Sequence, residues 1–310
     1  MSEITLPPPL AADIPVREGV VDVSGAQLAY RLSGRPSGLP LLVFENGWGS
    51  SWHCWAWVER LLAPQTQLLF YDRAGIGGSR KTAPQSAEDI SLQLLALLDA
   101  LELRQPVLLV GHSYGGLMGV LHAAQQPQRL RALLQLDPTP EADDPWVDQQ
   151  LSWTQHIARF ARLCARLGIP DPIFCPAARK LPQPEARLVV QRAFNSVSSL
   201  SAGMDEFQLL PAIRAAIARG TAAVPRLTIS ANAVTEVKGF TRLLISPDKA
   251  RQMVERMHAL HRAPLQGPQA RWQTTPHAHG AMIFTPDGAT DVARQIMEYA
   301  KSLSVGGTQA

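Results

Sequence analysis

The sequence has no long hydrophobic run and no large excess of charge of one sign. No stretch approaches the ~18 apolar residues that a membrane-spanning helix needs, and residues 1–19 lack the apolar segment of a signal peptide. The 29 basic and 26 acidic side chains are mixed along the 310 residues, and the formal charge is only +3. This balance gives no sign of nucleic acid or of an anionic membrane as a partner. We therefore expect a cytoplasmic protein that binds a small molecule.

Cysteine is scarce, and its spacing indicates neither a metal site nor a redox site. Cys54, Cys164 and Cys175 are too far apart for either pattern, so we expect free thiols in a reducing compartment. A single Cys164–Cys175 disulfide is the alternative. The glycine-rich stretches contain no P-loop lysine and no dinucleotide fingerprint. The sequence therefore predicts no metal and no organic cofactor.

The chain does contain a regular alternation of strand and helix patterns. Two alternating runs within residues 16–34 predict an antiparallel hairpin. Continuous apolar runs predict six further strands that are buried on both faces, at 39–46, 67–72, 106–112, 131–137, 225–230 and, more weakly, 271–276. Helical patterns fill most of the connections, at 51–63, 86–103, 116–126, 248–260 and 288–303. This order predicts an α/β protein with a doubly wound, mostly parallel sheet.

One segment interrupts the alternation. Residues 140–223 contain several helical patterns, punctuated by "GIPDP" and "LPQPE", and no convincing strand. We expect them to form a helical cap, inserted after the sixth strand, over the carboxyl edge of the sheet. The core would then consist of residues 1–139 and 224–310.

The stretch "LLVGHSYGG" (108–116) sets Ser113 between a buried strand and a helix. Gly-x-Ser-x-Gly in this setting is typical of a nucleophile elbow, in which the serine adopts a strained backbone conformation. Gly111 and Gly115 lack the side chains that would block this bend. The backbone N–H of Tyr114, at the start of the helix, would stabilise a nearby oxyanion. The alternative is a serine that only caps the helix.

The elbow and three further stretches resemble the α/β-hydrolase fold superfamily. "LLVFENGWGSS" is similar to the first strand and loop of that family with its His-Gly-x-Gly pattern, "YDRAGIGGS" to the stretch after the next strand, and "LDPTP" to the end of the strand after the elbow. With the region of His279, the motifs span residues 15–305 in the expected order. The resemblance implies that the backbone N–H of Trp48 is a second oxyanion donor, although Asn46 replaces the usual histidine. A glycine-rich turn with a packed tryptophan is the alternative, and Asp72 and Arg73 are expected to hold loops together.

The resemblance also implies a catalytic base and an acid. His279 is followed seven residues later by Pro286, as the family's histidine is, whereas His277 lacks a proline at that spacing. A metal pair formed by the two histidines has no third ligand in the sequence. Most of the superfamily places the acid after the strand that follows the cap, where this chain offers only Glu236. Some branches place it after the strand that follows the elbow, so we expect Asp137, with Glu236 or an incomplete triad as alternatives.

The resemblance implies hydrolysis of a carboxylic ester through an acyl-enzyme, without metal or cofactor. Lactone, thioester and amide substrates stay open, as do a slow-turnover receptor for a small signal and an inactive scaffold. A serine at the elbow, where family dehalogenases and epoxide hydrolases carry aspartate, argues against those two chemistries. Eight aromatic residues are candidates for an apolar acyl pocket or for ordinary core: Trp48, Trp52, Trp55, Trp146, Trp153, Phe160, Phe174 and Phe207.

Overall fold

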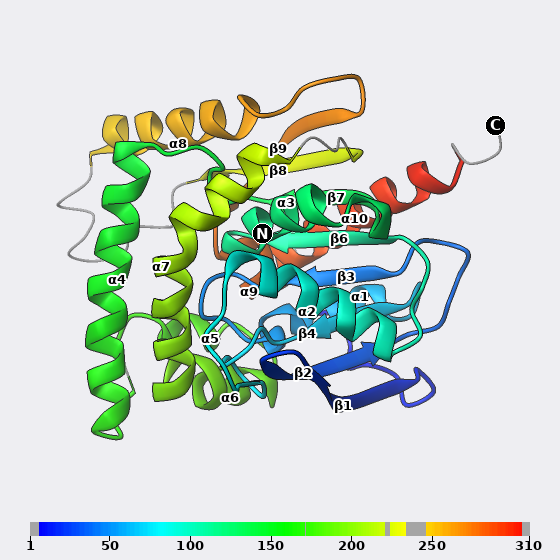
Figure 1. The fold of residues 1–310 in the computed structure, drawn as a ribbon, viewed down its shortest axis with the longest axis horizontal. Helices are drawn as coiled ribbons and strands as arrows, with labels where there is room; N and C mark the ends of the chain where they lie inside the picture. The colour runs from blue at the N-terminus through cyan, green and yellow to red at the C-terminus, as the bar shows by residue number, and fades with distance from the viewer. Residues whose placement is uncertain (1–5, 171, 221–223, 234–245, 306–310) are drawn as a thin grey trace.

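The computed structural model describes residues 6–170, 172–220, 224–233 and 246–305. Nine strands within these described residues form one sheet in the order β1-β2-β4-β3-β6-β7-β8-β9, with β5 beside β2 (Figure 1). The hairpin β1/β2 pairs antiparallel with β4, and every pairing from β4 to β9 is parallel. The strands are β1 Val16–Val23, β2 Ala26–Ser33, β3 Leu42–Glu45, β4 Leu68–Tyr71, β5 Arg80–Lys81, β6 Val107–His112, β7 Leu130–Leu136, β8 Arg226–Ala233 and β9 Ala270–Ala278. The predicted doubly wound, mostly parallel sheet is confirmed.

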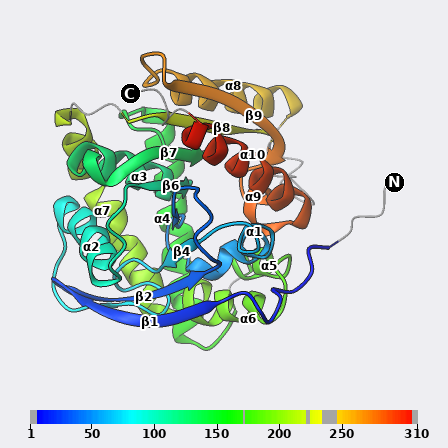
Figure 2. The ribbon, with the colours of Figure 1, turned by 90° about the vertical axis from the view of Figure 1, so that its right-hand side faces the viewer.

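Helices cover both faces of this sheet (Figure 2). One face packs against α1 (Ala56–Leu62), α9 (Ala281–Phe284) and α10 (Pro286–Val305), and the other against α2 (Ala87–Ala100) and α3 (Tyr114–Gln125). The central strands β3, β4 and β6 are buried throughout, which explains why their sequences are continuously apolar. α8 (Pro247–Arg262) lies beside β8. The start of α2 follows from the sequence, since Ser86 and Asp89 form a capping box.

Among the described residues between β7 and β8 are four α-helices, α4 (Pro145–Arg166), α5 (Cys175–Ala178), α6 (Glu185–Val189) and α7 (Val197–Arg219), and a π-helical turn at Val190–Phe194 that follows α6. We call them the cap helices. In Figure 1, α4 and α7 stand beside the carboxyl ends of the parallel strands. The cap helices follow the seventh strand, β7, whereas the sequence predicted them after the sixth. The additional strand is β5, which is only two residues long and forms no recognisable pattern in the sequence. The division at residues 139/140 and 223/224 stays a prediction.

Three further observations concern sequence expectations. Among the described residues, no helix is both long and apolar enough to cross a bilayer. Cys164 is a free thiol buried in α4, so the alternative Cys164–Cys175 disulfide is not formed. The helix expected at 51–63 begins as a short 3-10 turn at Trp52–Trp55, and α1 follows it.

Candidate active site

Ser113 stands on a strained bend between β6 and α3. Its φ of 57° and ψ of −121° are sparsely populated by residues other than glycine. A Cβ atom on Gly111 would lie 2.3 Å from the carbonyl oxygen of Gly115, and one on Gly115 would lie 2.2 Å from that of Glu45. Both glycines are therefore required sterically. Ser113 occupies the N-cap position of α3, but its hydroxyl accepts no capping hydrogen bond from that helix.

Asp137, directly after β7, is joined to His279 by a short hydrogen bond. Nδ1 of His279 lies 2.6 Å from Oδ2 of Asp137, while Oδ1 accepts the N–H of Ala231 at 3.0 Å. Burial raises the pKa of Asp137, but the hydrogen bond and charge of His279 outweigh burial and bring this pKa to about 2. The carboxylate therefore stays ionised and holds a proton on Nδ1, which leaves Nε2 available as a base. Asp137 itself has a φ of 44°, a conformation that asparagine and aspartate tolerate.

The other candidates for base and acid lie elsewhere. His277, on β9, has its Nε2 3.8 Å from Oδ2 of Asp291 on α10. Glu236 lies outside the described residues. Within the described residues, Asp137 is therefore the carboxylate that is hydrogen-bonded to His279.

Two further histidines, His112 and His261, support this pair. His112, the residue before Ser113, donates from Nε2 to the carbonyl oxygen of His279 at 3.0 Å, and the two rings lie 4.5 Å apart. Burial, and next the charge of His279, lower the pKa of His112 to about 3, so the ring stays neutral. His261, on α8, donates from Nε2 to the carbonyl oxygen of Pro138 at 2.7 Å. The supporting role of His112 could have been suspected from its position inside the elbow motif, whereas nothing in the sequence indicated a role for His261.

The loop formed by residues 46–49 follows β3 and lies against the elbow. Nη1 and Nη2 of Arg73 donate to the carbonyl oxygens of Asn46 and Gly47 at 2.6 and 3.0 Å. In a trans peptide the C=O and the following N–H point in opposite directions. Because Arg73 holds the Gly47 carbonyl, the N–H of Trp48 is turned to the opposite side of the loop. Gly47 and Trp48 line the same cavity as Ser113.

Arg73 also links this loop to the cap helix α7. The guanidinium lies 2.7 Å from Oε1 of Glu45 and 2.5 Å from Oε1 of Glu206, and all three side chains are buried. Glu206 belongs to the cap helix α7, and the backbone N–H of Gly49 acts to lower its pKa. Burial raises the pKa of Glu206, and Arg73 opposes that rise. Arg73 was expected to hold loops together, and it also connects the 46–49 loop to the cap helix α7.

Trp48 and Asn46 have fixed places in the same loop. Nε1 of Trp48 donates to the carbonyl oxygen of Gly203 on α7 at 2.5 Å, and its ring lies 4.7 Å from that of Phe207. Asn46, which replaces the family's histidine, is buried; its side chain donates to the carbonyl of Tyr71 and accepts from the indole of Trp55. The substitution is therefore accommodated by hydrogen bonds within the core.

Two cavities meet at Ser113 and His279. The larger has a volume of about 340 Å³ and is lined mainly by apolar side chains of the cap and of the 46–49 loop, including Trp48, Phe174, Phe194, Leu200 and Phe207. The smaller, of about 200 Å³, lies toward Trp146 and Met257. Of the other aromatic candidates, Trp52 and Trp55 are core residues, and Trp153 and Phe160 are exposed on the surface. Within the described ranges, no three His, Cys, Asp or Glu side chains gather where they could hold a metal ion.

Comparisons with known proteins agree with this architecture. A family model described as the alpha/beta hydrolase fold matches residues 40–163. The mouse sn-1-specific diacylglycerol lipase ABHD11 is 29% identical over 174 residues, which are 56% of this chain and 54% of the mouse protein. The chain spans less than two thirds of the length of the curated relatives that it matches.

Solved structures resemble almost the whole chain. The enol-lactonase from Burkholderia xenovorans LB400 superposes with a TM-score of 0.59 at 20% identity, over 91% of this chain and 100% of that one. A thermophilic esterase from Thermogutta terrifontis gives a TM-score of 0.59 at 18% identity, over 93% and 99%. At these identities the likeness establishes the fold alone.

Proposed function

We propose that this protein, a member of the α/β-hydrolase fold superfamily, is a serine hydrolase that cleaves a carboxylic ester through an acyl-enzyme. The observation that carries the proposal is the 2.6 Å hydrogen bond between Asp137 and His279, at the cavity that Ser113 also lines. A nucleophile, a base and an orienting acid are the set that this chemistry requires.

In the proposed first half-reaction, Nε2 of His279 takes the proton of the Ser113 hydroxyl as Oγ attacks the ester carbonyl carbon. The carbonyl oxygen becomes an oxyanion and accepts hydrogen bonds from the backbone N–H groups of Trp48 and Tyr114. Tyr114 is the first residue of α3, so its N–H has no acceptor within the helix. The bond to the alcohol oxygen then breaks, and His279 passes its proton to the leaving alcohol.

In the second half-reaction, water takes the place of the alcohol. His279 removes a proton from the water, which attacks the acyl carbon, and the same two N–H groups stabilise the second oxyanion. The bond to Ser113 breaks, the serine recovers its proton from His279, and the carboxylic acid leaves. Asp137 remains ionised throughout, consistent with its low pKa.

The two cavities support an uncharged substrate with an apolar acyl group. The described residues that line the larger cavity include no Asp, Glu, Lys or Arg, and the smaller cavity includes only Asp137. We assign the acyl group to the larger cavity, beside the 46–49 loop, and the alcohol to the smaller one. Lactone, thioester and amide substrates would use the same mechanism, but no feature of the cavities favours them over a carboxylic ester.

A labelling and turnover experiment tests the proposal. The wild type is incubated with a fluorophosphonate probe and assayed with p-nitrophenyl esters of increasing acyl length. Ser113→Ala should abolish labelling and lower kcat by about 10⁵–10⁶. His279→Ala should lose most activity, whereas the control His277→Ala should retain it. A wild type that is neither labelled nor active refutes the proposal, and labelling followed by a single turnover supports the receptor alternative.

A further inference from the structure

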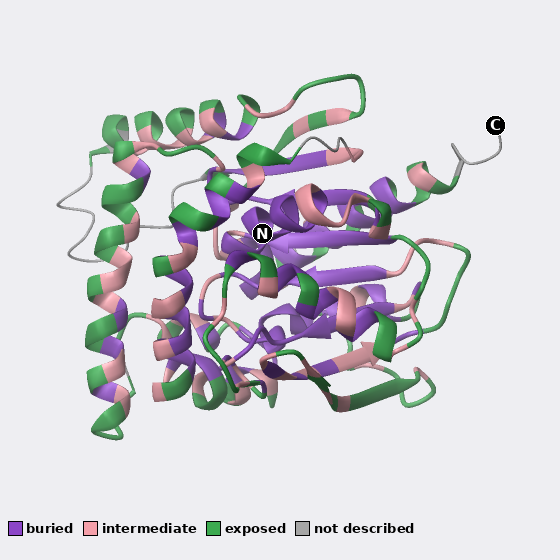
Figure 3. Cartoon of the chain, in the orientation of Figure 1, coloured by how far each residue is buried: buried purple, intermediate pink, exposed green. Residues whose placement is uncertain are grey.

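The outer side of the cap exposes an unusual concentration of large apolar side chains. Of the ten such side chains that are exposed in the described part of the chain, six lie within residues 153–173. We call these six the outer patch: Trp153, Phe160, Leu163, Leu167, Ile169 and Ile173. Trp153 and Leu167 are each 65% exposed, and Figure 3 shows how much of α4 is open to solvent. Contiguous exposed apolar surface of this kind usually marks an interaction site.

Three residues of the outer patch lie on one side of α4. At 100° per residue, Trp153, Phe160 and Leu163 fall within an arc of about 80° around the helix axis. The buried residues of α4, among them Ala158 and Ala161, belong to the side that packs on α7. The helix therefore has a second apolar face, which no described part of the chain covers.

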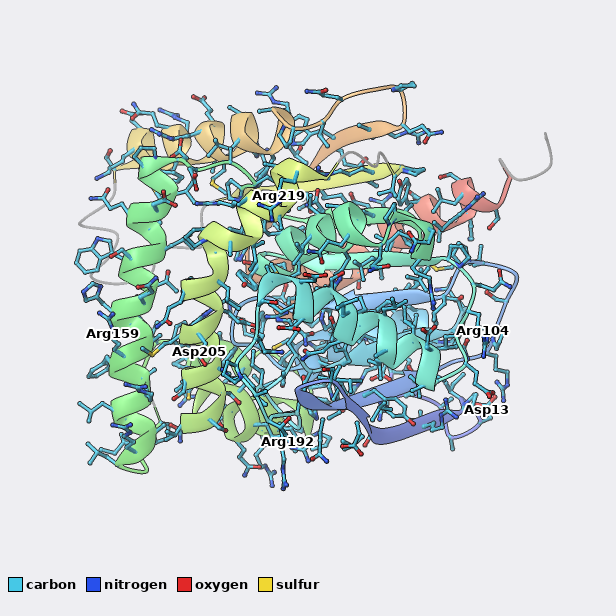
Figure 4. The ribbon with its side chains drawn as sticks, in the orientation of Figure 1. Asp13, Arg104, Arg159, Arg192, Asp205 and Arg219 are labelled. Atoms are coloured by element: carbon cyan, nitrogen blue, oxygen red, sulfur yellow. The ribbon has the colours of Figure 1, made fainter. Side chains whose placement is uncertain are left out.

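Basic side chains border this apolar face. Residues 155–166 contain Arg159, Arg162 and Arg166 and no acidic residue, and Arg159 and Arg166 are exposed. Figure 4 shows Arg159 at the outer edge of α4. Arg179 and Lys180, also exposed, follow α5. A helix with Trp, Phe and Leu on one side and arginine beside them fits the interface of a membrane with anionic headgroups.

The outer patch and the larger cavity share one residue. Leu151 and Thr154 of α4 line that cavity, and so does Ile173, which is 47% exposed and belongs to the patch. The cavity that leads to Ser113 thus reaches the surface beside the patch. An ester held in a lipid phase could enter it without first dissolving in water.

We propose that the outer patch docks this protein on an anionic lipid surface, from which the cavity draws an apolar ester. The identity of the substrate rests on the proposed function, whereas the docking does not. The expectation of no membrane partner was drawn from the mixed charges and the net charge of only +3 of the whole chain, whereas this proposal rests on the three arginines within residues 155–166. A second copy of this chain is the alternative occupant, and the test below distinguishes it from a lipid surface.

Vesicle flotation tests the docking with the full chain. Vesicles of phosphatidylcholine alone are compared with vesicles of equal parts phosphatidylcholine and phosphatidylglycerol. The wild type should float with the anionic vesicles, and less at high salt. The triple variant W153S/F160S/L163S should bind about tenfold more weakly or worse, and R159Q/R166Q should lose the preference for anionic vesicles. The matched control V20S/L92S changes two exposed apolar residues outside the cap and should bind like the wild type.

Hydrolysis separates docking from catalysis. All variants should hydrolyse soluble p-nitrophenyl acetate at the wild-type rate, which also shows that they fold, and the patch variants should be slower only on an emulsified long-chain ester. A wild type that ignores anionic vesicles, or a triple variant that binds them equally well, overturns the proposal. So does a wild-type dimer in analytical ultracentrifugation that the triple variant dissociates. A wild type that floats but hydrolyses no ester leaves the docking intact and refutes the proposed function.

Discussion

Replacing Glu206 by glutamine should slow catalysis although residue 206 lies on the cap. Arg73 fixes the carbonyls of Asn46 and Gly47, and Glu206 holds Arg73 at 2.5 Å. Glutamine keeps the size of the side chain and one acceptor oxygen but loses the charge. Arg73 stays paired with Glu45 at 2.7 Å, so no buried charge is left alone.

The expected size of the effect follows from the role of the loop. Removing an oxyanion donor outright typically lowers kcat by about 10²–10³. Glu206→Gln only loosens the peptide that carries the Trp48 N–H, so we expect kcat to fall by about tenfold. KM should change little, because the oxyanion forms only in the transition state. Arg73→Lys keeps the charge but loses the planar guanidinium that reaches both carbonyls. Its loss of kcat should therefore approach the upper end of the range of about 10²–10³.

The chain offers a matched control for this change. Arg31 also has two carboxylate partners, Glu59 at 2.6 Å and Glu18, and it lies on β2, away from the cavity. Glu59→Gln therefore removes a comparable ion pair without touching the 46–49 loop. The measurements are kcat, KM and Tm for each variant, together with the affinity for a boronic acid, which mimics the tetrahedral oxyanion. If Glu206→Gln has the kcat and boronate affinity of Glu59→Gln, Arg73 and Glu206 do not position the oxyanion donor.

Three further predictions concern the acid and the elbow. Asp137→Asn should lower kcat by about 10⁴ and Glu236→Gln should not; the reverse result in steady-state assays would make Glu236 the acid. Because the folded-state pKa of Asp137, about 2, lies below its ordinary value, its carboxylate stabilises the fold by about 2 kcal/mol above roughly pH 4, and this contribution disappears toward pH 2. The difference in the free energy of urea unfolding between the wild type and Asp137→Asn should therefore become smaller as the pH falls over that range. A difference that stays constant would contradict the proposed link between this pKa and stability. Gly115→Ala should lose both stability and activity, because the added Cβ would lie 2.2 Å from the carbonyl oxygen of Glu45. The control is Gly168→Ala, where φ is 70° and no atom lies within 4 Å of the added Cβ. This variant should lose about 1 kcal/mol of stability and no activity.

Much of the fold was predictable because its signals are local. A central parallel strand must be apolar on both faces, so β3, β4 and β6 can be recognised in the sequence as continuous apolar runs. The bend at Ser113 could also be predicted from local sequence, since only glycine fits at positions 111 and 115. β5 could not be predicted, because two paired residues form no pattern.

The support around the site was not predictable, because it depends on long-range contacts. Arg73 and Glu206 are 133 residues apart in the chain, and His261 and Pro138 are 123 apart. Neither pair has a periodicity or a short motif that marks it. Only the packing of α7 and α8 on the core brings these groups to the loop and to the acid.

The sequence by itself determined the parallel sheet, the elbow at Ser113 and the identity of His279 as the leading candidate for the base, since each depends on residues that are neighbours in the chain. Tertiary structure decided the rest. It joined Asp137 at the end of β7 to His279 after β9, because parallel strands deliver their carboxyl ends to one edge of the sheet. It also set Arg73 against Glu206 of the cap, since side chains remote in sequence become neighbours only when the helices pack.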